Sequence, residues 1–325
     1  MHKNFKKLLA KQHTHDKNFN KGRRIILKVE LENIISIDES SQDQVIKVYN
    51  RYGIFVGAPV VRKRNLKTSF NPIFTLNEDV TYEQVAALYK SLEHELGIVS
   101  IGERFYFDFS DSEYEQTPLF TLNSTGNSPE MFLDDRGTLF SISTYCKQCG
   151  LMEKEQLSPL VIDTSQMKDR YLVHVSGYWV ASEELVALMK QANIAGYELL
   201  EVIHCGSDEG KQRAYQIIPT QMLPSSSSER IKLYFATEQA PCKCGLSGVI
   251  NGPDIYDADD IMNLHGDVFY SSEWSHDGRY LYRKTIFSRK FRELIINNHI
   301  SREVRGEKDQ NFGPKDWLFD PVLLK

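Results

Sequence analysis

The sequence predicts an α+β protein with two domains, and three observations support this class. The chain has 325 residues, of which 41% are hydrophobic, enough for a sizeable core and for two domains. It contains both strand-like runs of aromatic and β-branched residues and apolar stripes at helical spacing. A turn-rich stretch at residues 123–129 separates two halves. We therefore expect domains at residues 25–125 and 126–325, the second with a mixed or antiparallel sheet.

The first 24 residues are strongly basic. They contain a single acidic residue, Asp16, and lack the apolar segment of a secretory signal. This composition predicts a flexible, solvated tail, with contact to nucleic acid or lipid as the alternative. The basic residues are Lys3, Lys6, Lys7, Lys11, Lys17, Lys21, Arg23 and Arg24.

In the N-terminal half, the pattern predicts three strands and one helix. Thr81 and Gln84 form a capping box that begins the helix, and Gly97 ends it. The predicted strands cover residues 24–31, 52–61 and 104–109. The buried stripe of the helix is expected at Val85, Leu88, Leu92 and Leu96.

In the C-terminal half, two helices are expected among several strands. Ser182 caps the first helix and Gly196 stops it, while the second covers about residues 288–298. The strands are expected at residues 138–145, 171–180, 197–204, 214–218 and 231–236, with the third and fourth paired. The buried helix residues are expected to be Leu185, Leu188, Met189, Phe291, Leu294 and Ile295.

Two short cysteine clusters carry the main chemical signal. Cys146-Lys-Gln-Cys149 and Cys242-Lys-Cys244 are each followed at once by glycine, which permits a tight turn. Together they offer four thiolates, the number that tetrahedral Zn²⁺ requires, on strand-turn knuckles similar to those of a zinc ribbon. Such a closed site would be structural. The alternative is two pairs of half-buried thiols packed as small hydrophobic groups.

Composition narrows the classes of partner and compartment. An odd number of cysteines, five, in a large chain without a secretion signal indicates reduced thiols or metal binding, so we expect a cytoplasmic protein. The formal net charge of −5 favours neither nucleic acid nor an anionic membrane as partner. No apolar run approaches the length of about 20 residues that a membrane helix requires.

An acidic cluster is the candidate partner-binding surface. It could attract a basic protein or bind a divalent cation, although it lacks the spacing of an EF-hand. The alternative is the capped start of a helix with solvated aspartates. Its members are Asp254, Asp257, Asp259 and Asp260.

No motif predicts an enzyme. The chain lacks phosphate-binding glycine loops, a nucleophile elbow and an H-E-x-x-H metal motif. A metal-dependent hydrolase would have to use His204, Cys205 or His276 beside the aspartates. A zinc-containing nucleic-acid-binding protein is the other alternative, although a solvated basic face explains its residues better. Those residues are Arg283, Lys284, Arg289, Lys290 and Arg292.

Residues 130–305 carry an ordered set of short motifs around these cysteines. The set comprises Cys146-Lys-Gln-Cys149-Gly150, the helix after Trp179, Gly196-Tyr-Glu-Leu-Leu-Glu-Val202, Ala240-Pro-Cys-Lys-Cys-Gly245, Gly266-Asp-Val-Phe269 and residues 286–294. In this order they resemble the bacterial double-CXXCG-motif family, whose members include immunity proteins that neutralise toxins. The resemblance implies a protein that binds and occludes a cognate toxin and performs no reaction.

Overall fold

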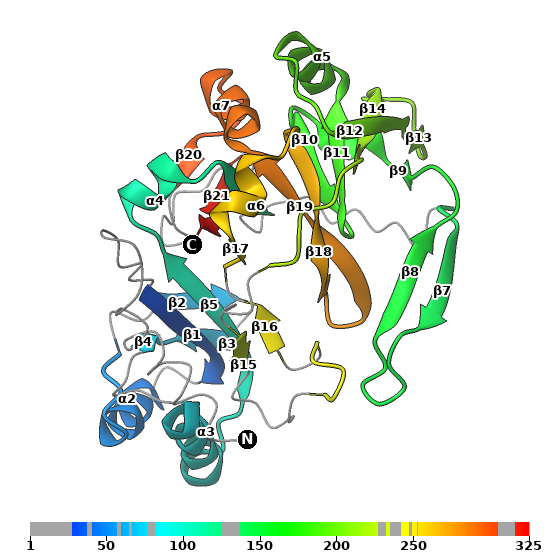
Figure 1. Ribbon diagram of the computed structural model, residues 1–325. Coiled ribbons are helices and arrows are strands. Elements are labelled where there is room, and N and C mark those ends of the chain that lie inside the picture. Colours follow the sequence, from blue (N-terminus) through cyan, green and yellow to red (C-terminus); the bar gives the residue numbers. More distant parts are fainter. Residues whose placement is uncertain are drawn as a thin grey trace. The chain divides into compact units, whose positions relative to one another are not determined.

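The computed structural model describes most of the chain outside its first 27 residues (Figure 1). The predicted tail, the cap residue Thr81 and most of the predicted boundary stretch lie outside the described residues. The described residues are 28–37, 41–56, 60–64, 67–76, 82–124, 137–226, 232–234, 242–246, 249–251, 253–304 and 316–324. They contain helices together with antiparallel and mixed sheets, which confirms the α+β class.

The chain divides into two compact units. The N-terminal unit comprises Met1–Phe109, Ile231–Pro241 and Gly248–Ile250, and the C-terminal unit comprises the rest. This division falls before the predicted boundary at residue 125. The reason is that β6 (Leu119–Ser124) pairs with strands near the end of the chain and belongs to their sheet.

The sheet of the N-terminal unit is built around β1 (Lys28–Ile37). Residues Val29 to Glu32 pair with both β4 (Ile73–Leu76) and β5 (Ser100–Asp108), which therefore lie on opposite edges of β1. Further along, β1 pairs with β3 (Lys67–Asn71), which in turn pairs with β2 (Val60–Arg64). All these pairings are antiparallel.

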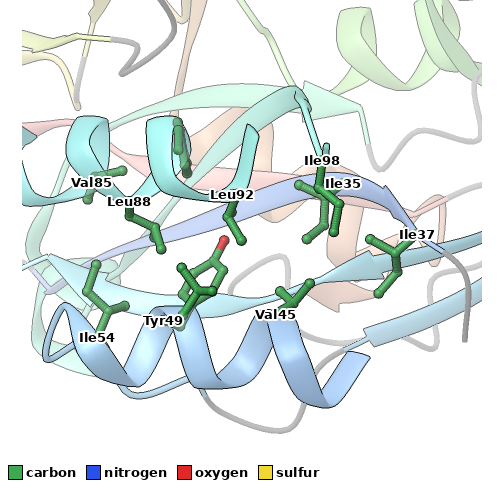
Figure 2. Close-up of a cluster of buried hydrophobic side chains, with 11 residues drawn as sticks. Ile35, Ile37, Val45, Tyr49, Ile54, Val85, Leu88, Leu92 and Ile98 are labelled. Atoms are coloured by element: carbon green, nitrogen blue, oxygen red, sulfur yellow. The ribbon is translucent and has the colours of Figure 1, made fainter. Parts of the chain in front are cut away.

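Two helices provide most of the core of this unit. Helix α3 (Tyr82–Leu96) buries Val85, Leu88 and Leu92 at the predicted spacing, whereas Leu96 is half-buried. Gly97 follows the helix with φ of +65°. Figure 2 shows these side chains and those of α2 (Gln42–Arg51) pointing toward one another. The cluster contains Ile35, Ile37, Val45, Val48, Tyr49, Ile54, Val85, Leu88, Tyr89, Leu92 and Ile98.

The strand predicted at residues 52–61 is wrong over its first half. Helix α2 ends at Arg51, and the amides of Tyr52 and Gly53 donate to carbonyl oxygens of its last turn. Gly53 has φ of +70°, the left-handed conformation with which glycine ends a helix. Ile54 is buried because it packs back onto α2. A strand, β2, begins only at Val60.

The C-terminal unit has a seven-stranded mixed sheet. Its strand order is β20 (Glu303–Val304), β21 (Trp317–Pro321), β6, β19 (Tyr280–Ser288), β8 (Met152–Gln156) and β7 (Phe140–Thr144), while β18 (Val268–His276) also pairs with β19. The β19–β8 and β20–β21 pairs are parallel, and the others are antiparallel. Helix α4 (Asp111–Gln116) precedes β6 and starts with a capping box at Ser110.

A second, antiparallel sheet has the order β10 (Leu172–Val175), β11 (Tyr178–Ser182), β14 (Ala214–Pro219) and β12 (Tyr197–Glu201). The single strand predicted at residues 171–180 is a hairpin, because Ser176 and Gly177 both have positive φ, as a two-residue turn requires. The predicted pairing of residues 197–204 with 214–218 is confirmed by β12 and β14.

Both predicted helices of this unit are present. Ser182 caps α5 (Glu183–Gln191) and Ser288 caps α7 (Arg289–Asn297), each hydroxyl accepting a bond from an amide of the first turn. Leu185, Met189, Phe291, Leu294 and Ile295 are buried as expected, whereas Leu188 is half-buried.

Aromatic contacts join the two sheets of the C-terminal unit. Trp179 of β11 contacts Phe287 of β19 and Trp317 of β21, with ring centroids 5.7 and 4.8 Å apart. Gly196 lies so close to β18 that a Cβ atom there would stand 2.9 Å from the carbonyl oxygen of Val268. The two sheets therefore share one core.

Short elements complete the described chain. They are β9 (Val161–Ile162), η3 (Thr164–Met167), β13 (Ile203–His204), β15 (Lys232–Tyr234), β16 (Val249–Asn251), β17 (Ile255–Tyr256), α6 (Ala258–Met262) and β22 (Leu323–Leu324). Across the described residues, every helix is too short or too polar to traverse a lipid bilayer.

Candidate metal centre

The first cysteine cluster lies in the loop that connects β7 to β8. The amides of Tyr145 and Cys146 both donate to the carbonyl oxygen of Leu151, at 2.9 and 3.1 Å. Within the loop, the amide of Gly150 donates to the carbonyl oxygen of Cys146 at 2.9 Å, with φ of +77° at the glycine. This turn brings the Cys146 and Cys149 sulfurs to the same side of the loop.

The second cluster repeats this turn with one residue fewer. The amide of Gly245 donates to the carbonyl oxygen of Cys242 at 2.9 Å, and its φ is +76°. Glycine adopts this left-handed conformation without the steric cost of a Cβ atom. The same residue type therefore closes both knuckles, as the sequence predicts.

The four sulfur atoms lie together. All are within 4.8 Å of one another, with 3.6 Å between the sulfurs of Cys146 and Cys242 and 3.7 Å between those of Cys149 and Cys244. Sulfurs on a tetrahedral ion at metal–sulfur distances of about 2.3 Å stand about 3.8 Å apart. The donor set and spacing thus fit one tetrahedral ion, and the structure brings together all four cysteines singled out from the sequence.

The tip of the β18–β19 hairpin holds both knuckles. Next to the first, the carbonyl oxygen of Arg279 accepts from the amide of Met152 at 2.9 Å. Next to the second, His276 Nε2 lies 3.0 Å from the carbonyl oxygen of Leu246. Because His276 Nδ1 accepts from the amide of Gly278, Nε2 carries the proton and donates. One hairpin turn thus contacts two loops that are far apart in sequence.

Backbone amides favour the ionised form of the Cys146 thiol. Hydrogen bonds from the amides of Cys149 and then Gln148 lower the pKa of Cys146 to about 7. The pKa of Cys149 is raised, first by burial and further by its contacts with the other three sulfurs. Four adjacent sulfurs do not all ionise readily without a cation among them, so this arrangement favours a bound metal ion.

Within the described part of the chain, the histidines and the fifth cysteine proposed for a hydrolase do not form a metal-binding cluster. His204 has both ring nitrogens engaged, Nδ1 with the Thr164 hydroxyl and Nε2 with the carbonyl oxygen of Ser207, each at 2.9 Å. His276 holds the second knuckle. Among the described residues, the four cysteines form the one cluster of three or more metal-ligand side chains, and Cys205 is not part of it.

The acidic cluster is divided by burial. Asp254 is only 2% exposed, and its carboxylate accepts from Lys284 Nζ at 2.9 Å, so it is wrong as a docking residue. Asp257, Asp259 and Asp260 are exposed at the N-terminus of α6. Acidic side chains at this end of a helix also interact favourably with the positive end of the helix dipole. The candidate docking surface, here called the α6 acidic surface, therefore consists of these three residues.

Most of the basic residues proposed for nucleic-acid binding make contacts within the protein. Arg283 donates to main-chain carbonyl oxygens and lies 4.3 Å from the Trp274 ring, and Arg289 donates to the carbonyl oxygen of Thr117 at 2.6 Å. Arg292 is buried, with its guanidinium 4.9 Å from the Phe120 ring. Among the five, Lys290 alone is exposed. They do not form the solvated basic face that the sequence favours.

Sequence reasoning missed the role of His276 as a support for the second knuckle. The available signal was weak: His276 precedes an Asp-Gly pair, which marks a hairpin turn. The partner atom is a main-chain carbonyl of Leu246, and no side-chain pattern encodes such a contact.

No known protein family, curated protein or solved structure matches this chain.

Proposed function

We propose that Cys146, Cys149, Cys242 and Cys244 bind one structural Zn²⁺. The observation that carries this proposal is the separation of the four sulfurs, all within 4.8 Å. Four thiolates in a tetrahedral arrangement favour zinc or iron over harder cations. With all four positions supplied by the chain, no position remains for water or substrate, so the ion would hold the fold and drive no reaction.

Metal analysis of the protein purified under reducing conditions tests this proposal. We expect one zinc per chain, no iron, and loss of the metal in Cys149→Ser. The variant should also be less stable, by about 4 kcal/mol where free zinc is a thousandfold above its dissociation constant. Cys205→Ser is the matched control, because Cys205 is also a half-buried cysteine but lies outside the cluster. Stoichiometric zinc in Cys149→Ser, or none in the natural protein, contradicts the site.

We further propose that the protein is a cytoplasmic immunity protein that binds and neutralises a toxin. The support is the resemblance of residues 130–305 to the double-CXXCG-motif family, together with a cysteine cluster suited to stabilising a binding scaffold. The α6 acidic surface offers negative charge to a basic toxin and would accelerate association with it.

Co-expression tests the immunity role. The product of the adjacent gene should be toxic in bacteria alone and harmless beside this protein. Absence of protection by the natural protein contradicts the immunity role.

The docking surface is tested separately by reversing Asp257, Asp259 and Asp260 to lysine. We expect this triple variant to associate with the toxin more slowly than the natural protein does, by about tenfold or more at low salt. Reversal of Asp208 and Glu209, exposed in a different loop, is the control. Unchanged binding of the triple variant removes the α6 acidic surface and leaves the immunity role intact.

A further inference from the structure

Strand β7 is an unusual sheet edge. It ends the strand order of the mixed sheet, and the structure pairs it with β8 alone among the described strands (Figure 1). Its residues Ser141 to Thr144 are all exposed. Natural proteins protect such edges with charges, prolines or bulges, since an open edge invites another strand. The edge strand β12 of the neighbouring sheet follows this rule with Glu198 and Glu201.

The segment that contains β7 has none of these protections. Residues 139–145 read Leu-Phe-Ser-Ile-Ser-Thr-Tyr, with no charge, proline or glycine. Pairing with β8 runs without a register shift from Phe140 to Thr144, so no bulge twists the edge away. Three of its side chains are exposed apolar groups, with exposed fractions of 63% for Leu139, 50% for Ile142 and 45% for Tyr145. The segment is therefore suited to pairing with another strand.

The hydrogen-bond pattern shows which backbone groups are on the open side. Leu139 and Tyr145 bond to β8, through Leu157 N to Leu139 O and Tyr145 N to Leu151 O, both at 2.9 Å. Residues facing the neighbouring strand alternate along an antiparallel ladder, so Ser141 and Ser143 also face β8. The N–H and C=O groups of Phe140, Ile142 and Thr144 consequently point away from it, toward an incoming strand.

We infer that a second copy of this chain pairs with β7, antiparallel and about a two-fold axis at Ile142. In this register Phe140 lies opposite the partner subunit's Thr144, so every outward-facing residue meets another outward-facing residue. Both N–H···O bonds of each such pair can then form. The segment is thus complementary to itself in its backbone, as a two-fold interface requires.

The side chains match in the same register. Exposed Leu139 lies opposite the partner subunit's Tyr145, and exposed Ile142 lies opposite its own copy. Ser141 lies opposite the partner subunit's Ser143. Each exposed apolar group of the strand therefore gains an apolar neighbour, and no charge is buried. Cross-strand pairs of this kind stabilise a sheet.

The size of the interface sets the expected affinity. One pair of short strands buries less than the roughly 1,200 Å² at which stable specific interfaces begin. We therefore expect a reversible dimer whose population depends on concentration, with dissociation in the micromolar range. This inference concerns β7 alone and does not depend on the proposed immunity function.

Sedimentation velocity of the full chain, purified under reducing conditions, tests the dimer. The natural protein should change from monomer to a discrete dimer between low and high micromolar concentration. Ile142→Lys places two like charges at the axis and should weaken the dimer roughly tenfold or more. Ile203→Lys is the matched control, because Ile203 is also 50% exposed and lies in a strand, β13.

Two further variants identify the occupant and the register. Ile142→Glu alone should be monomeric, but mixed with Ile142→Lys it should form a heterodimer, because each residue at the axis faces its own counterpart. Ile142→Pro removes only an outward-facing amide, so it should abolish the dimer with little loss of stability. Four outcomes overturn the inference: a monomer at all concentrations, undefined larger aggregates, an equal effect of Ile203→Lys, or no association in the mixture.

Discussion

His276 donates from Nε2 to the carbonyl oxygen of Leu246 at 3.0 Å, two residues after the last of the four clustered cysteines. The ring accepts from the amide of Gly278 at its other nitrogen, so both its orientation and its tautomer are fixed. Through this bond the tip of the β18–β19 hairpin supports the second knuckle. The histidine therefore acts on the proposed metal site without contacting the metal.

His276→Ala should weaken zinc binding by about tenfold or more, because supports of this kind typically change metal affinity by 10–100-fold. Competition with a coloured chelator measures the affinity. His276→Gln should recover part of the loss, since its side-chain amide can place an N–H near the position of Nε2. His265→Gln, at an exposed histidine, should have no effect. Equal zinc affinity in His276→Ala and the natural protein would remove this supporting role.

Asp254→Asn should destabilise the C-terminal unit by about 3 kcal/mol, because it leaves Lys284 without its carboxylate. The carboxylate side chain is fully buried and the lysine side chain is 20% exposed, which places the effect at the lower end for a broken buried pair. Urea denaturation measures the free energy of unfolding.

Asp259→Asn is the control for Asp254→Asn, because Asp259 is an exposed aspartate near the start of α6. It should change the free energy of unfolding by less than about 0.5 kcal/mol. Combining Asp254→Asn with Lys284→Met should restore much of the loss, because no unpaired charge then remains. Full stability of Asp254→Asn alone would show that the ion pair contributes nothing to the fold.

Burial lowers the pKa of His174 to about 4, beside the ring of Trp179 at 4.8 Å. The unfolded chain binds a proton at this residue below its ordinary value of about 6.5, whereas the folded chain does so only near 4. The associated stability is therefore present above pH 6.5 and is lost as pH falls from 6.5 to about 4. The total is about 3 kcal/mol.

The difference in stability between natural protein and His174→Gln isolates this contribution, because acid effects on the cysteine cluster are common to both. The natural protein should lose more stability than the variant between pH 6.5 and 4.5. Parallel curves for the two proteins would contradict the effect of burial on His174.

Gly196→Ala should destabilise the protein by about 2–3 kcal/mol or more. The new Cβ atom would meet the carbonyl oxygen of Val268 at 2.9 Å, and the residue has φ of +87°. Gly278→Ala is the control for the backbone conformation alone, since its φ is +101° and no atom lies within 4 Å of the added Cβ. It should cost about 1 kcal/mol. A similar loss in both variants would mean that the contact with β18 contributes nothing.

The sequence predicted the elements whose signals are local. Ser182 indicated a helix start by its side-chain chemistry, and the spacing of Val85, Leu88 and Leu92 marked the buried face of α3. The cysteine cluster was predictable for the same reason, because C-x-x-C-G and C-x-C-G each contain the ligands and the glycine of their turn. The helix start, the buried face of α3 and each knuckle depend on residues within one or two turns of chain. The meeting of the two knuckles depends instead on contacts across 95 and 96 positions.

The remaining features depend on contacts that are distant in sequence. Helix α2 was missed because its apolar residues Val45, Val48 and Tyr49 are few, and burial against α3 decides their state. Asp254 was assigned to a surface because the sequence does not reveal that Lys284, thirty residues away, pairs with it. The hairpin of β10 and β11 was read as one strand because Ser176 adopts a left-handed conformation that serine rarely takes.

Strand β6 lies between β19 and β21 and pairs directly with both. The contact of Asn123 with Asp320 spans 197 positions, and that of Thr117 with Val322 spans 205. The centre of this sheet therefore cannot form until remote parts of the chain have met, which is entropically slow. We expect refolding of the C-terminal unit to be limited by this search, on a timescale of seconds. During synthesis β6 would therefore remain unpaired until β19 and β21, which lie far downstream in the sequence, have emerged from the ribosome.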